Sequence, residues 1–150
     1  MMLFLVHHAD ALDPLVDPRR PLSTLGRLAA ERVAAQTAAR GAQPSVVWHS
    51  GKLRARQTAE IFWRACNALA EYSATRDLQP GDPASWMRDR LRGESRDIMI
   101  VGHFPHLPAL LALLLSNQGA PAHGFPPHGV VALSTSDEGT SWSEAWRIQG

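Results

Sequence analysis

The sequence predicts a three-layer α/β/α fold with a mainly parallel, mixed sheet of about six strands. Segments typical of strands alternate along the chain with segments of helical periodicity, which favours parallel strands joined by helices. Residues 2–6 and 97–103 are almost continuously apolar, as expected for strands buried on both faces. The segments 128–136 and 141–149 flank the turn DEG and predict a hairpin-like pair near the C-terminal end.

The remaining elements follow from their boundary residues. Residues 10–21 hold three prolines and three aspartates, which predicts a loop. Ser23 is a typical N-cap for a helix that Gly41 ends, and Ser50 is the expected N-cap of a helix reaching about Asn67. Leu25, Leu28, Ala29 and Val33 supply the helical spacing of the first helix. The other expected elements are strands at 45–48 and 72–78 and helices at 84–92 and 107–116.

Size and composition indicate one globular domain over residues 1–150. A net charge of +1 gives no reason to expect nucleic acid or an anionic membrane as the main partner. The most apolar stretch, 107–115, is shorter than the ~20 residues of a membrane span. The leading apolar run lacks the basic start and cleavage site of a signal peptide, so we expect a cytoplasmic protein. Cys66, the only cysteine, excludes an internal disulfide and is expected to be a buried apolar residue.

Histidines gather where the predicted strands end. Ligands of parallel sheets bind at the carboxyl ends of the strands, so these side chains are expected to lie at one edge. Arg54 follows in the first turn of a helix, where backbone N–H groups and the helix dipole favour an anion. This pattern predicts a phosphate site containing an imidazole nucleophile, without the carboxylates that usually accompany a metal. The strand-end residues are His7, His8, His49, Ser50 and His103.

Four segments, in this order, carry a family resemblance: LVHHADA, RPLSTLG, HSGKLRARQTAE and IVGHFPHL. They resemble the four motifs of the histidine phosphatase (phosphoglycerate mutase-like) superfamily. The length and the segments LQPGDP and FPPHGVV are most similar to the small phosphohistidine phosphatases. The resemblance covers nearly the whole chain. It implies a phosphoglycerate mutase-like fold and a phosphatase that needs no metal or other cofactor.

The resemblance also implies roles for individual residues. His8 matches the nucleophile, which takes the phosphoryl group before water hydrolyses the phosphohistidine. Arg54 matches the arginine that clamps the phosphate, and His103 the second histidine, which donates to phosphoryl oxygens. Arg20 matches a position that can also reach the phosphate in the small members. A neutral imidazole is a competent nucleophile near pH 7, and cationic groups stabilise phosphoryl transfer, so the chemistry agrees with these roles.

Two departures from the family motifs concern the substrate-binding edge. His7 stands where the family has an arginine, so an always-charged guanidinium is replaced by an imidazole. His49 precedes Ser50 in an unfamiliar context, and we expect both to lie at the substrate-binding edge. Since His7 and His49 both end strands, they could form a compensating pair.

Three roles remain open for His7. It could be a structural residue, a metal ligand, or a donor that holds phosphate when protonated. In the last case activity should rise as the pH drops toward about 6.

The general acid is the least defined role. Asp82 could be an acid at the mouth of the pocket or a turn residue, and the absence of a clearer candidate favours a substrate with a good leaving group, such as phosphohistidine.

The other histidines have no expected catalytic role. His106 is expected to be a cap or rim residue, and His123 and His128 to be exposed.

The sequence therefore predicts a metal-independent phosphatase that works through phosphorylated His8, on protein phosphohistidine. The alternatives are a weakened homologue that binds phosphorylated partners or small phosphates without turnover, and a phosphatase of small phosphate esters. The expected partner is a phosphorylated protein or a small phosphate ester.

Overall fold

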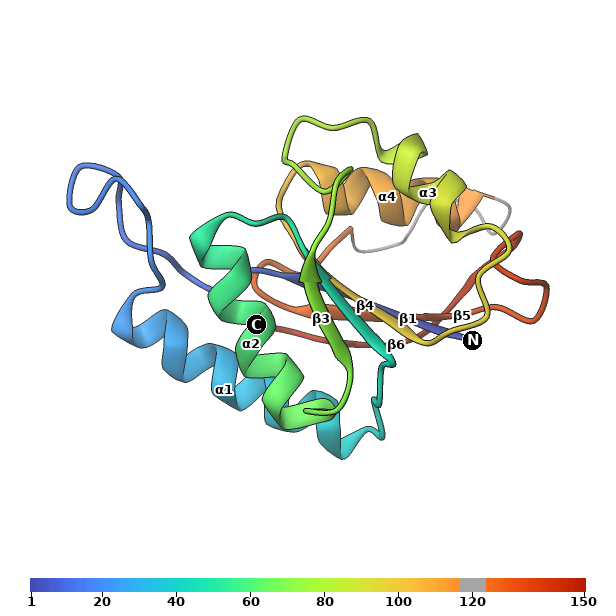
Figure 1. Cartoon of the computed structure of the whole chain (residues 1–150), viewed down its shortest axis with the longest axis horizontal. Helices are drawn as coiled ribbons and strands as arrows, with labels where there is room; N and C mark the ends of the chain where they lie inside the picture. Colours follow the sequence, from blue (N-terminus) through green and yellow to red (C-terminus); the bar gives the residue numbers. More distant parts are fainter. Residues whose placement is uncertain (117–123) are drawn as a thin grey trace.

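The computed structural model describes residues 1–116 and 124–150. Within this part of the chain, six strands form one mixed sheet in the order β3-β2-β4-β1-β5-β6, with helices on both faces (Figure 1). The predicted three-layer fold with a mainly parallel sheet is confirmed. The elements are β1 (Met2–His7), α1 (Thr24–Ala39), β2 (Val46–His49), α2 (Leu53–Cys66), β3 (Glu71–Ala74), α3 (Ala84–Leu91), β4 (Ile98–Gly102), α4 (His106–Leu114), β5 (Val130–Ser134) and β6 (Ser143–Ile148).

Strand β1 lies inside the sheet and sets the position of the site. It pairs in parallel with β4, so that His7 lies opposite Gly102, and antiparallel with β5, so that Val6 lies opposite Val130. The carboxyl ends of β1 and β4 therefore meet the beginning of β5 at one edge. None of the described helices is long and apolar enough to cross a membrane.

Apolar residues alternate along the strands and form a core on each face. On one face, side chains such as Leu5 and Ile100 pack with α3 and α4. On the other, Val6 and Val101 pack with α1 and α2, where Phe62 is fully buried. Figure 1 shows the two helix pairs on opposite sides of the sheet.

A glycine and a serine hold the chain after β1 against α1. The Ser23 hydroxyl accepts a hydrogen bond from the Gly26 N–H and donates to the Asp10 carboxylate, so the predicted N-cap is confirmed. A Cβ at Gly26 would lie only 2.1 Å from the Asp10 carbonyl oxygen. Only glycine permits this approach, which holds the segment that follows His8 in place.

Several predicted boundaries and faces are wrong. Strand β3 ends at Ala74, whereas the sequence predicted a strand to residue 78. The N-cap of α2 is Lys52, because the Ser50 side chain is engaged elsewhere. Leu25 and Leu28 are exposed, since α1 packs on the sheet through small residues. The buried residues of α1 are Gly26, Ala30, Val33, Ala34 and Thr37.

Candidate active site

Three histidine rings from two adjacent strands lie together at the carboxyl edge of the sheet. His7 is the last residue of β1, His8 follows it, and His103 follows β4. The ring centroid of His8 lies 4.6 Å from that of His7 and 5.1 Å from that of His103. Adjacent strand residues normally point to opposite faces, but at the end of β1 the rings of His7 and His8 approach each other.

Backbone contacts fix the tautomer of His8. Its Nδ1 lies 2.7 Å from the Ala9 carbonyl oxygen, and a carbonyl can only accept, so Nδ1 carries the hydrogen. The lone pair of the neutral ring is then on Nε2. The Ala9 N–H donates to Oγ1 of Thr58 on α2, which anchors this turn. Burial and the nearby Arg54 lower the pKa of His8 to about 4, against the raising effect of the Ala9 hydrogen bond. His8 is therefore an unprotonated base at neutral pH.

His103 is held from the neighbouring strand β2. Its Nε2 lies 2.6 Å from the Ser50 hydroxyl, and Ser50 Oγ also accepts from the Lys52 N–H. Burial, followed by the charge of a protonated His8, lowers the pKa of His103 to about 3. The Nδ1 atom of His103 is buried without a hydrogen-bond partner among the described residues. A neutral ring with a buried, unpartnered nitrogen among the described residues thus lies next to His8, with 5.1 Å between the ring centroids.

Two arginines bring positive charge to the histidines. Arg54 lies in the first turn of α2, and its Nε is buried without a partner among the described residues. Arg20, on the loop before α1, has a left-handed backbone with φ of 50° and donates through Nε to the Leu12 carbonyl. Burial and the proximity of Arg20 lower the pKa of Arg54. A buried guanidinium nitrogen beside a second cation indicates a site for an anion.

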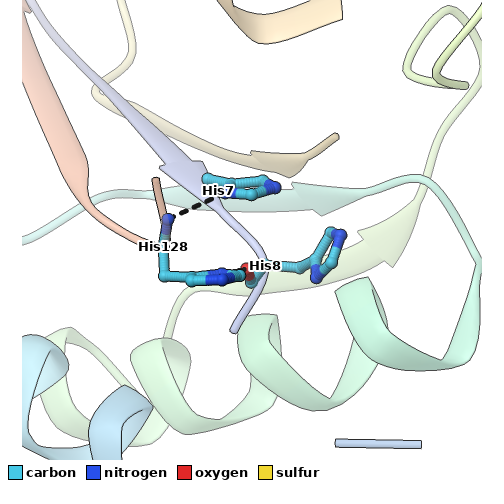
Figure 2. Close-up of side chains that lie close together, drawn as sticks. All are labelled: His7, His8 and His128. Atoms are coloured by element: carbon cyan, nitrogen blue, oxygen red, sulfur yellow. Dashed lines mark hydrogen bonds between the residues drawn. The ribbon is translucent and has the colours of Figure 1, made fainter. Parts of the chain in front are cut away.

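His7 is enclosed by two rings. It stacks on Phe104 at 4.0 Å, with 9° between the ring planes, and on His128 at 4.8 Å and 8°. Its Nδ1 accepts a hydrogen bond of 2.8 Å from the His128 backbone N–H (Figure 2). Burial and then the neighbouring His8 lower the pKa of His7 to about 3. This lowered pKa opposes the protonation of His7 on which the expected rise in activity toward pH 6 depends.

His49 lies apart from this cluster. Strand β4 separates β1 from β2, and His49 shares a face with Val47 toward α2, whereas His7 faces Phe104. The His49 Nδ1 accepts from the Gly51 N–H, and its ring lies 5.1 Å from Tyr72. A compensating pair of His7 and His49 is therefore excluded by the strand order.

Asp82 forms a hydrogen bond within its turn, and His106 is buried. The Asp82 carboxylate accepts from the Gln79 N–H, and the Gln79 side chain donates to the Ser50 carbonyl, which links this turn to the end of β2. His106 begins α4 and is 2% exposed, so the expected cap or rim position is wrong. Burial lowers its pKa, against the raising effect of Asp82.

Sequence reasoning missed His128, which was expected to be exposed. It is half-buried, and its Nδ1 donates to the His8 carbonyl oxygen at 2.7 Å. The antiparallel register of β1 and β5, continued by two residues past Val6 and Val130, places His128 opposite His8. An antiparallel assignment of that strand would have found it. His123 lies outside the described residues.

Among the described residues, the rings of His7, His8 and His128 form a group that could hold a metal ion. Each offers one ring nitrogen, and the three nitrogens lie within 4.8 Å of one another (Figure 2). A metal ligand needs a free lone pair, however, and the only lone pair of neutral His7 accepts the His128 N–H. The observed hydrogen bonds thus favour an anion over a cation here.

No protein-family model matches this chain, and no curated protein does. Solved structures do match. The protein histidine phosphatase SixA in complex with tungstate is 22% identical, with a TM-score of 0.82, over 99% of this chain and 97% of that one. A putative phosphohistidine phosphatase SixA from Agrobacterium tumefaciens is 23% identical, with a TM-score of 0.80 over the same shares.

A third match has a different stated activity. The mycobacterial glucosyl-3-phosphoglycerate phosphatase Rv2419c is 19% identical, with a TM-score of 0.70 over 96% of each chain. Full coverage at these scores confirms the fold that the four sequence motifs predicted. The chain has the fold of the histidine phosphatases, including those of the SixA type.

Proposed function

We propose that this chain is a metal-independent phosphatase in which His8 carries the phosphoryl group. One observation carries the proposal: the hydrogen bond from His8 Nδ1 to the Ala9 carbonyl leaves the lone pair on Nε2, and the charge of Arg54, whose Nε is buried without a partner among the described residues, acts on this ring. A nucleophile and a buried guanidinium donor thus share one site. The phosphatase structures with the same fold support the same reaction class.

The proposed reaction has two steps. His8 Nε2 bonds to phosphorus while the bond from phosphorus to the leaving group breaks, and the leaving group takes the electron pair. The Ala9 carbonyl accepts from Nδ1–H and so stabilises the positive charge that forms on the ring. Water then attacks phosphorus, the Nε2–P bond breaks, and phosphate and a proton are released. Arg54, with Arg20 beside it, stabilises the phosphoryl oxygens in both steps, and a ring nitrogen of His103 donates to them.

We further infer that the substrate is a protein phosphorylated on histidine. Among the described residues, no carboxylate hydrogen-bonds to His7, His8 or His103, and Asp82 is engaged by the Gln79 N–H. An alkyl phosphate needs a general acid for its alkoxide, whereas the imidazole of phosphohistidine leaves readily. Two of the structures with this fold are named as phosphatases of that substrate class.

The test compares the wild type with His8→Gln on a histidine-phosphorylated protein and on p-nitrophenyl phosphate. We expect faster turnover of the first substrate, a phosphoryl group on the wild-type enzyme after an alkaline quench, and no turnover by His8→Gln. His49→Gln is the matched control, since it changes a strand-end histidine outside the cluster, and should keep activity. Full activity in His8→Gln would end the proposal.

The two other functions give distinct results in the same assay. Binding of inorganic phosphate without turnover of either substrate would identify a non-catalytic phosphate binder. Preference for p-nitrophenyl phosphate would identify a phosphatase of small esters. The proposal includes no cofactor and no nucleic-acid partner, and places the protein in the cytoplasm, where a buried free Cys66 stays reduced.

A further inference from the structure

The surroundings of His7 fix which of its ring nitrogens carries hydrogen. The His128 backbone N–H points at Nδ1 over 2.8 Å, and a backbone N–H can only donate, so Nδ1 must hold a lone pair. The hydrogen of the neutral ring is then on Nε2. A hydrogen on Nδ1 would point at the hydrogen of the His128 backbone N–H, and the hydrogen bond would be lost. Geometry alone therefore selects the neutral ring with Nε2–H.

His7 and His8 consequently have opposite tautomers. His8 donates through Nδ1 to the Ala9 carbonyl and keeps its lone pair on Nε2, whereas His7 accepts at Nδ1 and keeps a hydrogen on Nε2. Figure 2 shows the far end of the His7 ring on the same side of β1 as the His8 ring. One histidine therefore presents a base and its neighbour presents a donor.

His128 and Phe104 hold the His7 ring in this orientation. The three rings are nearly parallel, with interplanar angles of 9° and 8° on the two sides of His7. The His128 ring is fixed in turn, because its Nδ1 donates to the His8 carbonyl. The pair His7 and His128 thus forms a rigid unit at the position where the family motif has an arginine.

The charges around His7 oppose its protonation. The groups that act on it are His8 directly after β1, His128 before β5, His103 after β4, and Arg54 on α2, and each lowers its pKa. Together with burial they keep the ring neutral throughout the physiological range. The Nε2–H of the neutral ring can still donate a hydrogen bond to an anion.

We propose, resting on the proposed phosphatase function, that His7 binds the phosphoryl group as a neutral donor through Nε2–H, and that His128 is its positioning residue. Phosphate binding at this position then does not depend on protonation of His7. The charge of the family arginine is not replaced, and Arg54 and Arg20 supply the cationic stabilisation.

The first experiment reads the tautomer without using activity. Nitrogen-15 NMR of the wild type, with the His7 signals identified by their loss in His7→Gln, should show an unprotonated Nδ1 and a protonated Nε2 from pH 6 to 8. A ring that carries hydrogen on Nδ1, or one that becomes charged in this range, would overturn the proposal.

The second experiment measures the affinity for inorganic phosphate and tungstate by calorimetry. The side chain of Gln can accept the His128 N–H and still donate to an anion. The affinity of His7→Gln should therefore lie within a few-fold of the wild-type affinity, and the ratio of the two affinities should stay constant from pH 6 to 8. His7→Phe keeps the stack but removes the donor, and should bind roughly 10- to 100-fold more weakly. His49→Gln, which also removes a ring that accepts a backbone N–H, should leave the affinity unchanged.

The outcomes separate this proposal from the proposed function. A wild-type to His7→Gln ratio that grows about tenfold toward pH 6 would show a charged His7 and overturn the neutral donor, with the phosphatase intact. An absence of anion binding in the wild type would overturn the proposed function as well. If the wild type binds zinc tightly and His7→Gln does not, His7 is a metal ligand and not a donor to phosphate, which would also overturn the proposal.

Discussion

The backbone N–H of His128 donates to Nδ1 of His7 across 121 positions of sequence. This bond, made just before β5 beside the end of β1, requires an unprotonated Nδ1 on His7, and burial lowers the pKa of the same ring to about 3. It also explains how a histidine lies here without adding a buried charge near Arg54.

Replacement of His7 by arginine should raise activity and lower stability. A guanidinium can stack between Phe104 and His128 and adds charge to the phosphate site, so we expect kcat/KM to rise about tenfold or more. The His128 N–H loses its acceptor, which costs about 1–3 kcal/mol of unfolding free energy. Steady-state kinetics and urea unfolding test both effects. Leu25→Arg adds the same charge to an exposed position of α1 and should change neither. An unchanged rate in His7→Arg would contradict the expected gain.

The pH should affect stability before it affects the nucleophile. His7, His8 and His103 have folded-state pKa values of about 3, 4 and 3, below the ordinary 6.5. At a pH between the folded-state values and 6.5, these three histidines are protonated in the unfolded chain and neutral in the folded chain. The stabilisation is complete above pH 6.5 and falls as the pH drops, by up to about 1.4 kcal/mol per pH unit for each ring. Urea unfolding at pH 7.5, 6 and 5 measures it, and a stability that does not change over this range would contradict the assignment.

Activity should not decline between pH 8 and 6 through titration of His8. Its folded-state pKa of about 4 keeps Nε2 unprotonated over this range. We expect the chemical step, measured by the rate of phosphoenzyme formation with saturating substrate, to stay within about threefold. A loss that follows a pKa near 6.5 would show that the nucleophile is solvated and not buried as in the structure.

Removal of the Ser50 hydroxyl should weaken catalysis through His103. Ser50→Ala leaves His103 Nε2 without its partner at 2.6 Å, so the ring loses its fixed orientation. We expect kcat to fall roughly 10- to 100-fold and the unfolding free energy by about 1–3 kcal/mol. Ser134→Ala, at a half-buried position on β5 whose hydroxyl lies 3.4 Å from that of Ser143, is the control for a lost hydroxyl. Unchanged kcat in Ser50→Ala would mean that His103 is oriented by other contacts.

A methyl group at Gly26 should displace the segment after His8. The added Cβ would lie 2.1 Å from the Asp10 carbonyl oxygen, which forces α1 and this segment apart. We expect Gly26→Ala to lose about 1–3 kcal/mol of stability and to bind phosphate more weakly. Gly81→Ala meets nothing within 4 Å and should be tolerated. Thermal unfolding and phosphate titration of both variants check this, and equal behaviour of the two would contradict the close approach.

Local sequence signals predicted the fold and the positions of the most apolar strands well. Apolar runs found β1, β2 and β4, and Ser23 and Gly41 marked the ends of α1, because buried strands and helix caps depend on nearby residues. The face of α1 was predicted poorly. Leu25 and Leu28 looked like core residues, yet they are exposed, and the helix packs through smaller side chains such as Gly26, Ala30 and Ala34.

The sequence by itself determined which residues reach the carboxyl edge, because a strand end is a local property: His7 ends β1, and His8, Ser50 and His103 follow their strands. The tertiary structure decided which of them meet. Strand order put β4 between His7 and His49, the alternation of side chains along β2 turned His49 to the other face, and the antiparallel β5 brought His128 against His7. It also decided the tautomers, because the hydrogen on each ring depends on a partner whose place only the folded sheet defines.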